Sequence, residues 1–314
     1  MRDRAAVGLR RSSGLCVLVL VVGGFALTGC SPHEEMGTKT TLTYCSPGGV
    51  AEQLDVYTPI PAPKAPVPVV VYVHGGGWIS GSRNFSVFIG LIEEQVVGAG
   101  HIFVSLDYRL APQNPWPAQI EDVKCAIRFL RYDARSLGID PTRIGAMGDS
   151  AGGQLVGMLG LAGPQAGFDV GQYLDESSAV QAVVDLYGPA DLTTPDWKGD
   201  SAMQTYAGET FGQDLGRLTV ELIDASPVTY ARAGAPPFLI VQGTKDAVVP
   251  PDQSTELQKR LTAAGDSASV VMVQNAGHGL LQVGPQTVSP GLVPLSQQIV
   301  GFLARTPRGR LSPS

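Results

Sequence analysis

The sequence predicts an α/β fold in which helices cover both faces of one mostly parallel sheet. Short apolar runs without polar alternation indicate strands that are covered on both faces. These runs cover residues 67–73, 102–106, 144–147, 180–186, 238–241 and 270–273. Segments with helical spacing alternate with them, over residues 85–99, 117–137, 151–161, 251–264 and 295–304. Of the 314 residues, 44% are hydrophobic and only 16% are charged, a composition that excludes a disordered chain.

The first thirty residues predict an export signal. Four arginines in residues 1–11 precede an apolar run over residues 15–27. A helix of that length spans roughly 20 Å, short of the roughly 30 Å hydrocarbon core, which favours a cleaved signal peptide over residues 1–29. The sequence Leu27-Thr28-Gly29-Cys30 resembles a bacterial lipobox. That resemblance implies that Cys30 is lipidated and begins the mature chain, held at the outer face of the cell membrane.

Charge and cysteine content limit the partners. The formal charge is -6, and residues 1–29 carry four positive charges and one negative, so the mature chain has a charge of -6 - 3 = -9. An acidic body of this kind argues against nucleic acid as a partner, and membrane attachment would depend on acyl chains. Cys45 and Cys125 remain after Cys16 and Cys30 are accounted for. Export permits them to form a disulfide, and the alternative is two separate buried thiols.

The mature chain opens with a predicted tether over residues 30–39, followed by one domain over residues 40–306 and a tail over 307–314. Residues 40–45 and 51–57 alternate as two strands, joined by a turn that contains Pro47, Gly48 and Gly49. Pro251 suits the first turn of the helix over residues 251–264, and Gly265 suits its end.

Residues 190–230 interrupt the alternation of strands and helices. They are rich in Asp, Thr, Gly and Trp, and they lie between two apparent strands. Long excursions in compact domains are usually functional, so we expect a small inserted cap over the carboxyl edge of the sheet. The alternative is a long surface loop.

A candidate nucleophile lies in Gly148-Asp149-Ser150-Ala151-Gly152, which fits G-x-S-x-G. The motif follows the apolar run 144–147 and precedes a helical segment, the strand–turn–helix context of a nucleophile elbow. Small flanking residues let Ser150 adopt a strained turn without colliding with neighbouring strands. The helix amino end behind it favours developing negative charge.

A serine nucleophile needs a base, and the chain has four histidines. His278 follows the last strand-like run, so it is expected at the edge where the elbow lies. His33 falls in the tether and His101 begins a buried strand. His74 precedes three glycines and is better suited to orienting that loop.

The imidazole in turn needs an acid that fixes its tautomer. Asp246 follows the run 238–241, and the order Ser150, Asp246, His278 is the one expected of a nucleophile-elbow hydrolase. Asp185, inside a strand, and Asp191, just after it, are weaker rivals. Asp149 is too close to the nucleophile in the chain to reach the histidine.

The site also needs donors for an oxyanion. His74-Gly75-Gly76-Gly77-Trp78 places unhindered backbone N–H groups after an early strand, and Ala151 supplies another after the nucleophile. We therefore expect Gly75, Gly76 and Ala151 to hold the oxyanion. Trp78 forms either the floor of the pocket or part of the core. This chemistry requires no metal or organic cofactor.

Five segments together resemble the hormone-sensitive-lipase-like carboxylesterases of the α/β-hydrolase fold: 74–78, 107–112, 148–153, 243–250 and 277–279. Ser226-Pro227 and the spacing from Asp246 to Pro250 are more similar to the feruloyl or xylan-type branch. The resemblance covers residues 42–304. Two features depart from it: little chain precedes the first strand, and Gln242-Gly243-Thr244-Lys245 replaces a His-Gly segment with a second acid.

The resemblance and the residues together predict a serine carboxylesterase that hydrolyses small-molecule or lipid esters through an acyl-enzyme. A peptidase or amidase on the same scaffold is one alternative. A catalytically inactive lipoprotein that binds partners at the cell envelope is the other.

Overall fold

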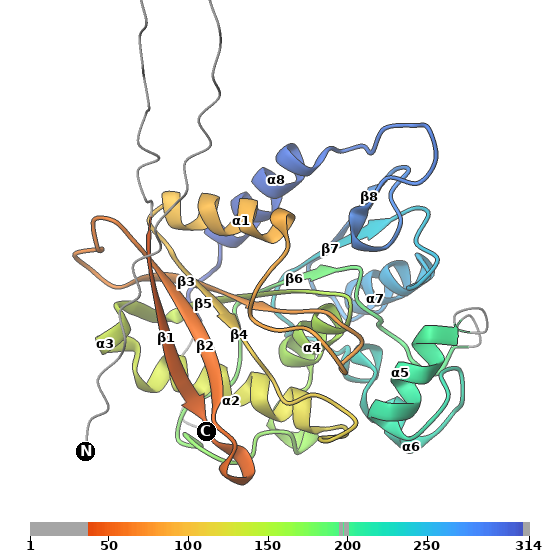
Figure 1. Ribbon diagram of the computed structural model, residues 1–314, viewed down its shortest axis with the longest axis horizontal. Helices are drawn as coiled ribbons and strands as arrows, with labels where there is room; N and C mark the ends of the chain where they lie inside the picture. The colour runs from red at the N-terminus through yellow and green to blue at the C-terminus, as the bar shows by residue number, and fades with distance from the viewer. Residues whose placement is uncertain (1–36, 195–196, 198–200, 310–314) are drawn as a thin grey trace, which may run out of the picture.

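The strands form one sheet, described here from a computed structural model that covers residues 37–194, 197 and 201–309. The predicted signal peptide, Cys30 and the end of the predicted tail lie outside these described residues. The sheet order is β1-β2-β4-β3-β5-β6-β7-β8 (Figure 1). The strands are β1 (Gly37–Cys45), β2 (Glu52–Pro59), β3 (Val67–Val73), β4 (Ile102–Leu106), β5 (Ile139–Asp149), β6 (Ala182–Leu186), β7 (Phe238–Gly243) and β8 (Ala268–Val273). β1, β2 and β4 pair antiparallel, and every pairing from β4 through β3 to β8 is parallel, which confirms the predicted fold class.

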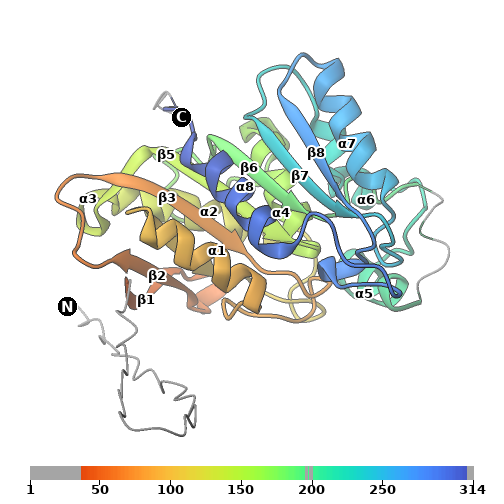
Figure 2. The ribbon, with the colours of Figure 1, turned by 90° about the horizontal axis from the view of Figure 1, so that it is seen from above.

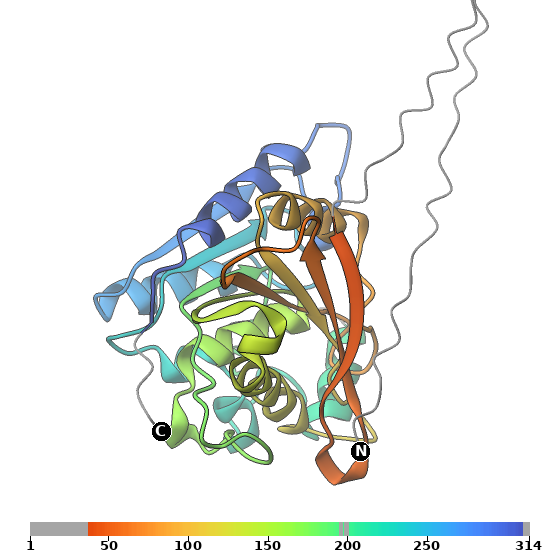
Figure 3. The ribbon, with the colours of Figure 1, turned by 90° about the vertical axis from the view of Figure 1, so that its left-hand side faces the viewer.

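Helices cover both faces of the sheet. They are α1 (Val87–Gly98), α2 (Ala118–Tyr132), α3 (Ala134–Leu137), α4 (Ala151–Leu161), α5 (Ser201–Phe211), α6 (Val220–Asp224), α7 (Asp252–Ala263) and α8 (Leu292–Ala304). Figure 2 shows α1 and α8 side by side on one face, and Figure 3 shows the yellow-green helices on the other. Among the described residues, no helix is long and apolar enough to cross a bilayer.

The continuous apolar runs are explained by two cores, one on each face of the sheet. In β3, Val69, Val71 and Val73 pack with α2 and α4, whereas Val70 and Tyr72 pack with α1 and α8. Successive strand side chains point to opposite faces, so a strand buried on both sides needs no polar alternation. This is why the sequence located β3 and β4 at their observed bounds.

Several boundaries differ from the prediction. β1 begins at Gly37, inside the predicted tether, because residues 37–39 pair with residues 57–59 of β2. β5 begins at Ile139 rather than at residue 144, because Ile139 pairs with Val67. The polar residues 140–143 lie between this pair and the apolar run, so the sequence pattern did not indicate a strand there. The helical segment 117–137 is divided at Asp133 into α2 and α3, and α8 begins three residues early at Leu292.

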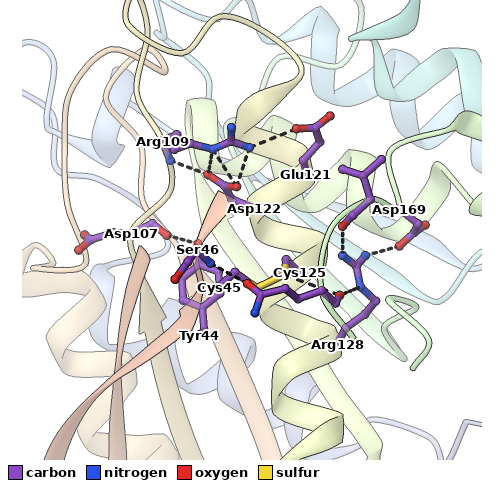
Figure 4. Close-up of a disulfide and its surroundings, with 12 residues drawn as sticks. Tyr44, Cys45, Ser46, Asp107, Arg109, Glu121, Asp122, Cys125, Arg128 and Asp169 are labelled. Atoms are coloured by element: carbon purple, nitrogen blue, oxygen red, sulfur yellow. Dashed lines mark hydrogen bonds and ion pairs between the residues drawn. A yellow bond between two sulfur atoms is a disulfide. The ribbon is translucent and has the colours of Figure 1, made fainter. Parts of the chain in front are cut away.

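A disulfide joins Cys45 at the end of β1 to Cys125 in α2, with the two Cα atoms 6.5 Å apart (Figure 4). Of the two options that the sequence left open, the structure has the pair. The bond connects the antiparallel edge of the sheet to α2, and the two cysteines are 80 positions apart in the sequence. Beside it, Arg128 in α2 contacts Asp169, which holds the segment after α4 against the same helix.

The insertion over residues 190–230 contains α5 and α6 and is fixed by buried polar side chains. Gln253 in α7 accepts hydrogen bonds from the N–H groups of Ala190 and Asp191, at 2.9 and 2.7 Å. The Ser226 hydroxyl accepts from Leu192 N–H and donates to the Leu222 carbonyl. These contacts leave the insertion at the carboxyl end of the sheet (Figure 1).

Candidate active site

Ser150 lies on a strained turn between β5 and α4, with φ 52° and ψ -119°. The flanking glycines are required by close backbone approach. A Cβ on Gly148 would lie 2.2 Å from the carbonyl oxygen of Gly152, and one on Gly152 would lie 2.1 Å from that of Val73. Only residues without a side chain fit there, so the turn can project the Ser150 hydroxyl above the sheet edge.

Three side chains from separate loops form one hydrogen-bonded chain. His278 Nε2 lies 2.9 Å from Ser150 Oγ, and His278 Nδ1 lies 2.9 Å from Asp246 Oδ2. The Asp246 side chain is fully buried, Ser150 is 9% exposed, and the imidazole keeps 25% of its surface. The structure thus brings together the three residues selected from the sequence, in the geometry that a nucleophile and its base require.

Each oxygen of the Asp246 carboxylate has two hydrogen-bond donors. Its Oδ1 accepts from the N–H groups of Val248 and Val249, both at 2.9 Å. Its Oδ2 accepts from His278 and also from Nε2 of Gln242, at 3.1 Å. A carboxylate held by four donors is fixed in orientation, and it fixes the imidazole in turn.

The rival acids have other partners. Asp185 Oδ1 accepts from Gly188 N–H at 2.8 Å, and burial raises the pKa of Asp185 from its usual 3.8 to about 7. Asp191 Oδ1 accepts from the N–H and hydroxyl of Thr193. His278 bonds to Asp246 rather than to either of them.

Asp149 anchors the glycine loop. Its Oδ1 accepts from the Tyr72 hydroxyl at 2.6 Å and from Gly75 N–H at 3.0 Å. Burial raises the pKa of Asp149, although both hydrogen bonds oppose that shift. The N–H of Gly75 is therefore committed to a carboxylate, and the prediction that it donates to an oxyanion is wrong.

The remaining predicted donors are Gly76 and Ala151. Gly76 follows Gly75 with φ 116°, and its neighbour Gly77 has φ 61°. Ala151 opens α4, where the first N–H groups have no partner within the helix. Within the described residues, the N–H groups of Gly76, Gly77 and Ala151 donate to no backbone carbonyl, so they can face a bound ligand.

His74 braces the loop rather than taking part in the proton chain. Its Nδ1 lies 2.7 Å from the Gly75 carbonyl oxygen, and its ring stacks on Tyr108 with centroids 4.2 Å apart. Burial lowers the pKa of His74, which favours a neutral ring. This placement matches the orienting role that the sequence indicated.

Trp78 belongs to the core and joins the loop to the insertion. It is fully buried, and its Nε1 donates to Gln154 Oε1 at 3.0 Å, while Gln154 Nε2 donates to the Ala225 carbonyl at 2.7 Å. Phe211 of α5 meets the Trp78 ring edge-on at 5.0 Å. Tyr206 of the same helix lies so close to Gly77 that a Cβ there would be 2.5 Å from the ring. The insertion thus lies directly against the glycine loop.

A family model named BD-FAE matches residues 54–261, about two thirds of the chain. That range includes Ser150, Gln242 and Asp246. The chain belongs to the BD-FAE family.

Individual relatives agree with this assignment. Esterase LipC of Mycobacterium tuberculosis is 32% identical over 271 residues, which are 83% of this chain and 64% of LipC, so the BD-FAE chain spans less than two thirds of that relative. A truncated carbohydrate esterase from gut microbiota superposes with a TM-score of 0.70 at 26% identity, covering 88% of this chain and 98% of its own. Thermogutta terrifontis esterase 2, in a structure phosphorylated by paraoxon, gives 0.66 at 25% identity, covering 89% and 98%. The sheet order and these neighbours show an α/β-hydrolase fold.

Two residues of the BD-FAE chain join the site without having been selected from the sequence. Tyr187 follows β6, and its ring meets the His278 imidazole edge-on at 5.0 Å. Gln242 ends the apolar run of β7 and is fully buried. The available signal was positional. Gln242 is a polar side chain in a buried strand and needs a partner, and Tyr187 directly follows the carboxyl end of β6.

Proposed function

We propose that this chain is a serine carboxylesterase. Ser150 Oγ attacks the ester carbonyl as His278 Nε2 takes its proton, and His278 then gives that proton to the departing alcohol. Water, deprotonated by the same nitrogen, releases the acid from Ser150. The observation that carries the proposal is the continuous chain Ser150–His278–Asp246, with both links at 2.9 Å.

The oxyanion would be held by backbone N–H groups of Gly76 and Ala151, with Gly77 as the next donor along the loop. Ala151 suits this role because it begins a helix whose amino end carries partial positive charge. Loss of one donor of this kind typically costs on the order of 10²–10³ in rate. LipC is named an esterase, and Thermogutta terrifontis esterase 2, which has the same fold, is phosphorylated by paraoxon, which supports ester hydrolysis here.

The decisive test replaces Ser150. The variant Ser150→Ala should lose at least about 10³-fold in turnover of p-nitrophenyl acetate, because no nucleophile remains. Its thermal melt should stay close to that of the wild-type protein. A fluorophosphonate probe should label the wild-type protein and not the variant. Retained activity would refute the nucleophile, and an unlabelled, inactive wild-type protein would favour an inactive binding protein.

The substrate is a carboxylic ester, of a small molecule or a lipid. Matched ester and anilide substrates separate an esterase from an amidase, and the esterase should hydrolyse the ester far faster. A panel from acetate to palmitate, with acetylated and feruloylated sugars, identifies the acyl and alcohol groups. The carbohydrate esterase among the structural neighbours is the reason for including sugars.

We also propose that the chain is exported and anchored by lipid at Cys30, as the lipobox-like sequence suggests. Metabolic labelling with palmitate should mark the wild-type protein, and Cys30→Ser should abolish the label. A labelled Cys30→Ser variant would contradict the anchor without bearing on the esterase.

A further inference from the structure

We propose that Gln242 and Ser254 form a polar relay that positions the acid of the triad and sets the pH at which His278 acts as a base. This inference rests on the proposed esterase function. Gln242 is a positioning residue, since it bonds to Asp246 and not to a reacting atom.

The contacts of Gln242 fix the orientation of its amide. The Nε2 group donates to Asp246 Oδ2 at 3.1 Å and to the Val249 carbonyl at 3.2 Å, and Oε1 accepts from the Ser254 hydroxyl at 2.8 Å. A flipped amide would turn its oxygen toward the carboxylate and a backbone carbonyl, neither of which has a proton to donate to it. The amide therefore presents N–H to the acid.

Burial makes this contact strong. Gln242 and Ser254 are both fully buried, and the Asp246 side chain is inaccessible to water. Hydrogen bonds to a charged group in such surroundings are stronger than exposed ones, and water cannot replace a lost partner. The relay connects the last residues of β7 to the first turn of α7, so it also fixes the loop that carries Asp246.

The contact bears on catalysis because Gln242 and His278 share one oxygen. Asp246 Oδ2 accepts from both Gln242 Nε2 and His278 Nδ1. A donor from Gln242 spreads part of the carboxylate charge away from the imidazole, so its removal strengthens the attraction between Asp246 and protonated His278. The other titratable groups that face the imidazole are Tyr187 after β6 and the buried Asp149 after β5.

The test compares Gln242→Met with Gln119→Met. Gln119 is an equally buried glutamine in α2 whose Nε2 donates to the Asn114 carbonyl, away from the triad. We expect Gln242→Met to lower kcat/KM for p-nitrophenyl acetate about tenfold, as for one hydrogen bond to a charged group, with kcat falling more than KM rises. The acidic limb of its pH profile should move up by about half a unit. Gln119→Met should change stability and leave the limb in place.

Ser254 provides an independent variant. Ser254→Ala should shift the limb in the same direction by less, because Gln242 keeps its donor but loses the partner that holds it. In the double variant, Ser254→Ala should add nothing to Gln242→Met, since Ser254 acts only through the amide. Gln242→Glu keeps the volume of the side chain and places a second carboxyl beside Asp246, so its acidic limb should move up further than that of Gln242→Met.

The outcomes separate the two proposals. Ester turnover and fluorophosphonate labelling of the wild-type protein test the esterase function. If the wild-type protein is active and folded Gln242→Met keeps the wild-type rate and acidic limb, the relay is refuted and the esterase stands. Additive effects in the double variant also refute it. If Gln242→Met does not fold, the limb of Ser254→Ala decides.

Discussion

Glu52, the first residue of β2, is an acid in an unfavourable position. It is only 8% exposed and lies near Asp122 and Asp107, with Arg109 as the compensating cation. Burial first, and then these two acids, raise the pKa of Glu52 from its usual 4.5 to about 7. The folded protein therefore holds this proton more tightly than the unfolded chain, and the free energy of unfolding falls as pH rises from about 4.5 to 7.

Glu52→Gln should remove this part of the pH dependence. At pH 8 the variant should be more stable by about 1–2 kcal/mol, because it relieves a buried charge that solvent only partly screens. At pH 4 both proteins are neutral at this position and should unfold at the same urea concentration. Urea titrations at both pH values measure the difference, and a gain that is equal at pH 4 and pH 8 would contradict the assignment.

The glycine loop marks the limit of residue-level prediction. Three successive glycines after His74 indicated backbone donors, and Gly75 does lie beside Ser150 in space. Which N–H is free depends on Asp149, 74 positions later in the chain, whose carboxylate takes the N–H of Gly75. Sequence spacing identifies the type of group but not its hydrogen-bond partner.

At the scale of elements, the strand–turn–helix around Ser150 leaves no room for a side chain. Gly152→Ala would place a Cβ within 2.1 Å of the Val73 carbonyl oxygen, so β3 or α4 must move. We expect a loss of about 1–3 kcal/mol in the free energy of unfolding, the usual cost of overpacking. Ester turnover should fall with it, because the nucleophile shifts.

Gly208→Ala in α5 is the matched control. Apart from the adjacent backbone of its own helix, no atom lies within 4 Å of its added Cβ, so the change should raise stability by about 0.5–1 kcal/mol through helix propensity alone. Urea unfolding of both variants measures the contrast. Equal effects at the two glycines would mean that close approach is not what requires Gly152.

Elements buried on both faces were predictable, and elements with polar ends were not. β3 and α4 have the bounds that the sequence indicated, because apolar runs and the elbow motif mark their ends. β5 extends back through Asp140 and Arg143, polar residues that resemble a loop until their pairing with β3 is known. The break at Asp133 likewise depends on packing rather than on composition. Asp246 and His278 could be predicted because the carboxyl ends of parallel strands share one edge of the sheet. Gln242 was not predicted as part of the site, because in the sequence it only marks the end of an apolar run.

At the scale of the molecule, the disulfide joins the antiparallel edge to the helical layer. Cys45→Ser combined with Cys125→Ser should lower the free energy of unfolding by about 2–4 kcal/mol, because the unfolded chain regains the freedom of a long loop. Ester turnover at 25 °C should persist, since β1 and α2 carry none of the triad residues. Melting with and without reductant measures the loss.

The variant with both cysteines replaced by serine also supplies the control for this measurement. Reductant should lower the melting temperature of the wild-type protein toward that of the variant and leave the variant unchanged. If the variant has the same melting temperature as the oxidised wild-type protein, the disulfide adds no stability.

The insertion over residues 190–230 is attached partly through its main-chain atoms and partly through buried side chains such as Phe211 and Leu222. Gln154 reaches the carbonyl of Ala225, and Gln253 reaches the N–H groups of Ala190 and Asp191. These main-chain hydrogen bonds use no side chain of the insertion, whereas Trp197, Phe211 and Leu222 are buried in the core and are needed for its packing. Engineering of this segment can therefore vary its exposed side chains, such as Leu218 and Val220, provided that its buried residues and the two glutamines are retained.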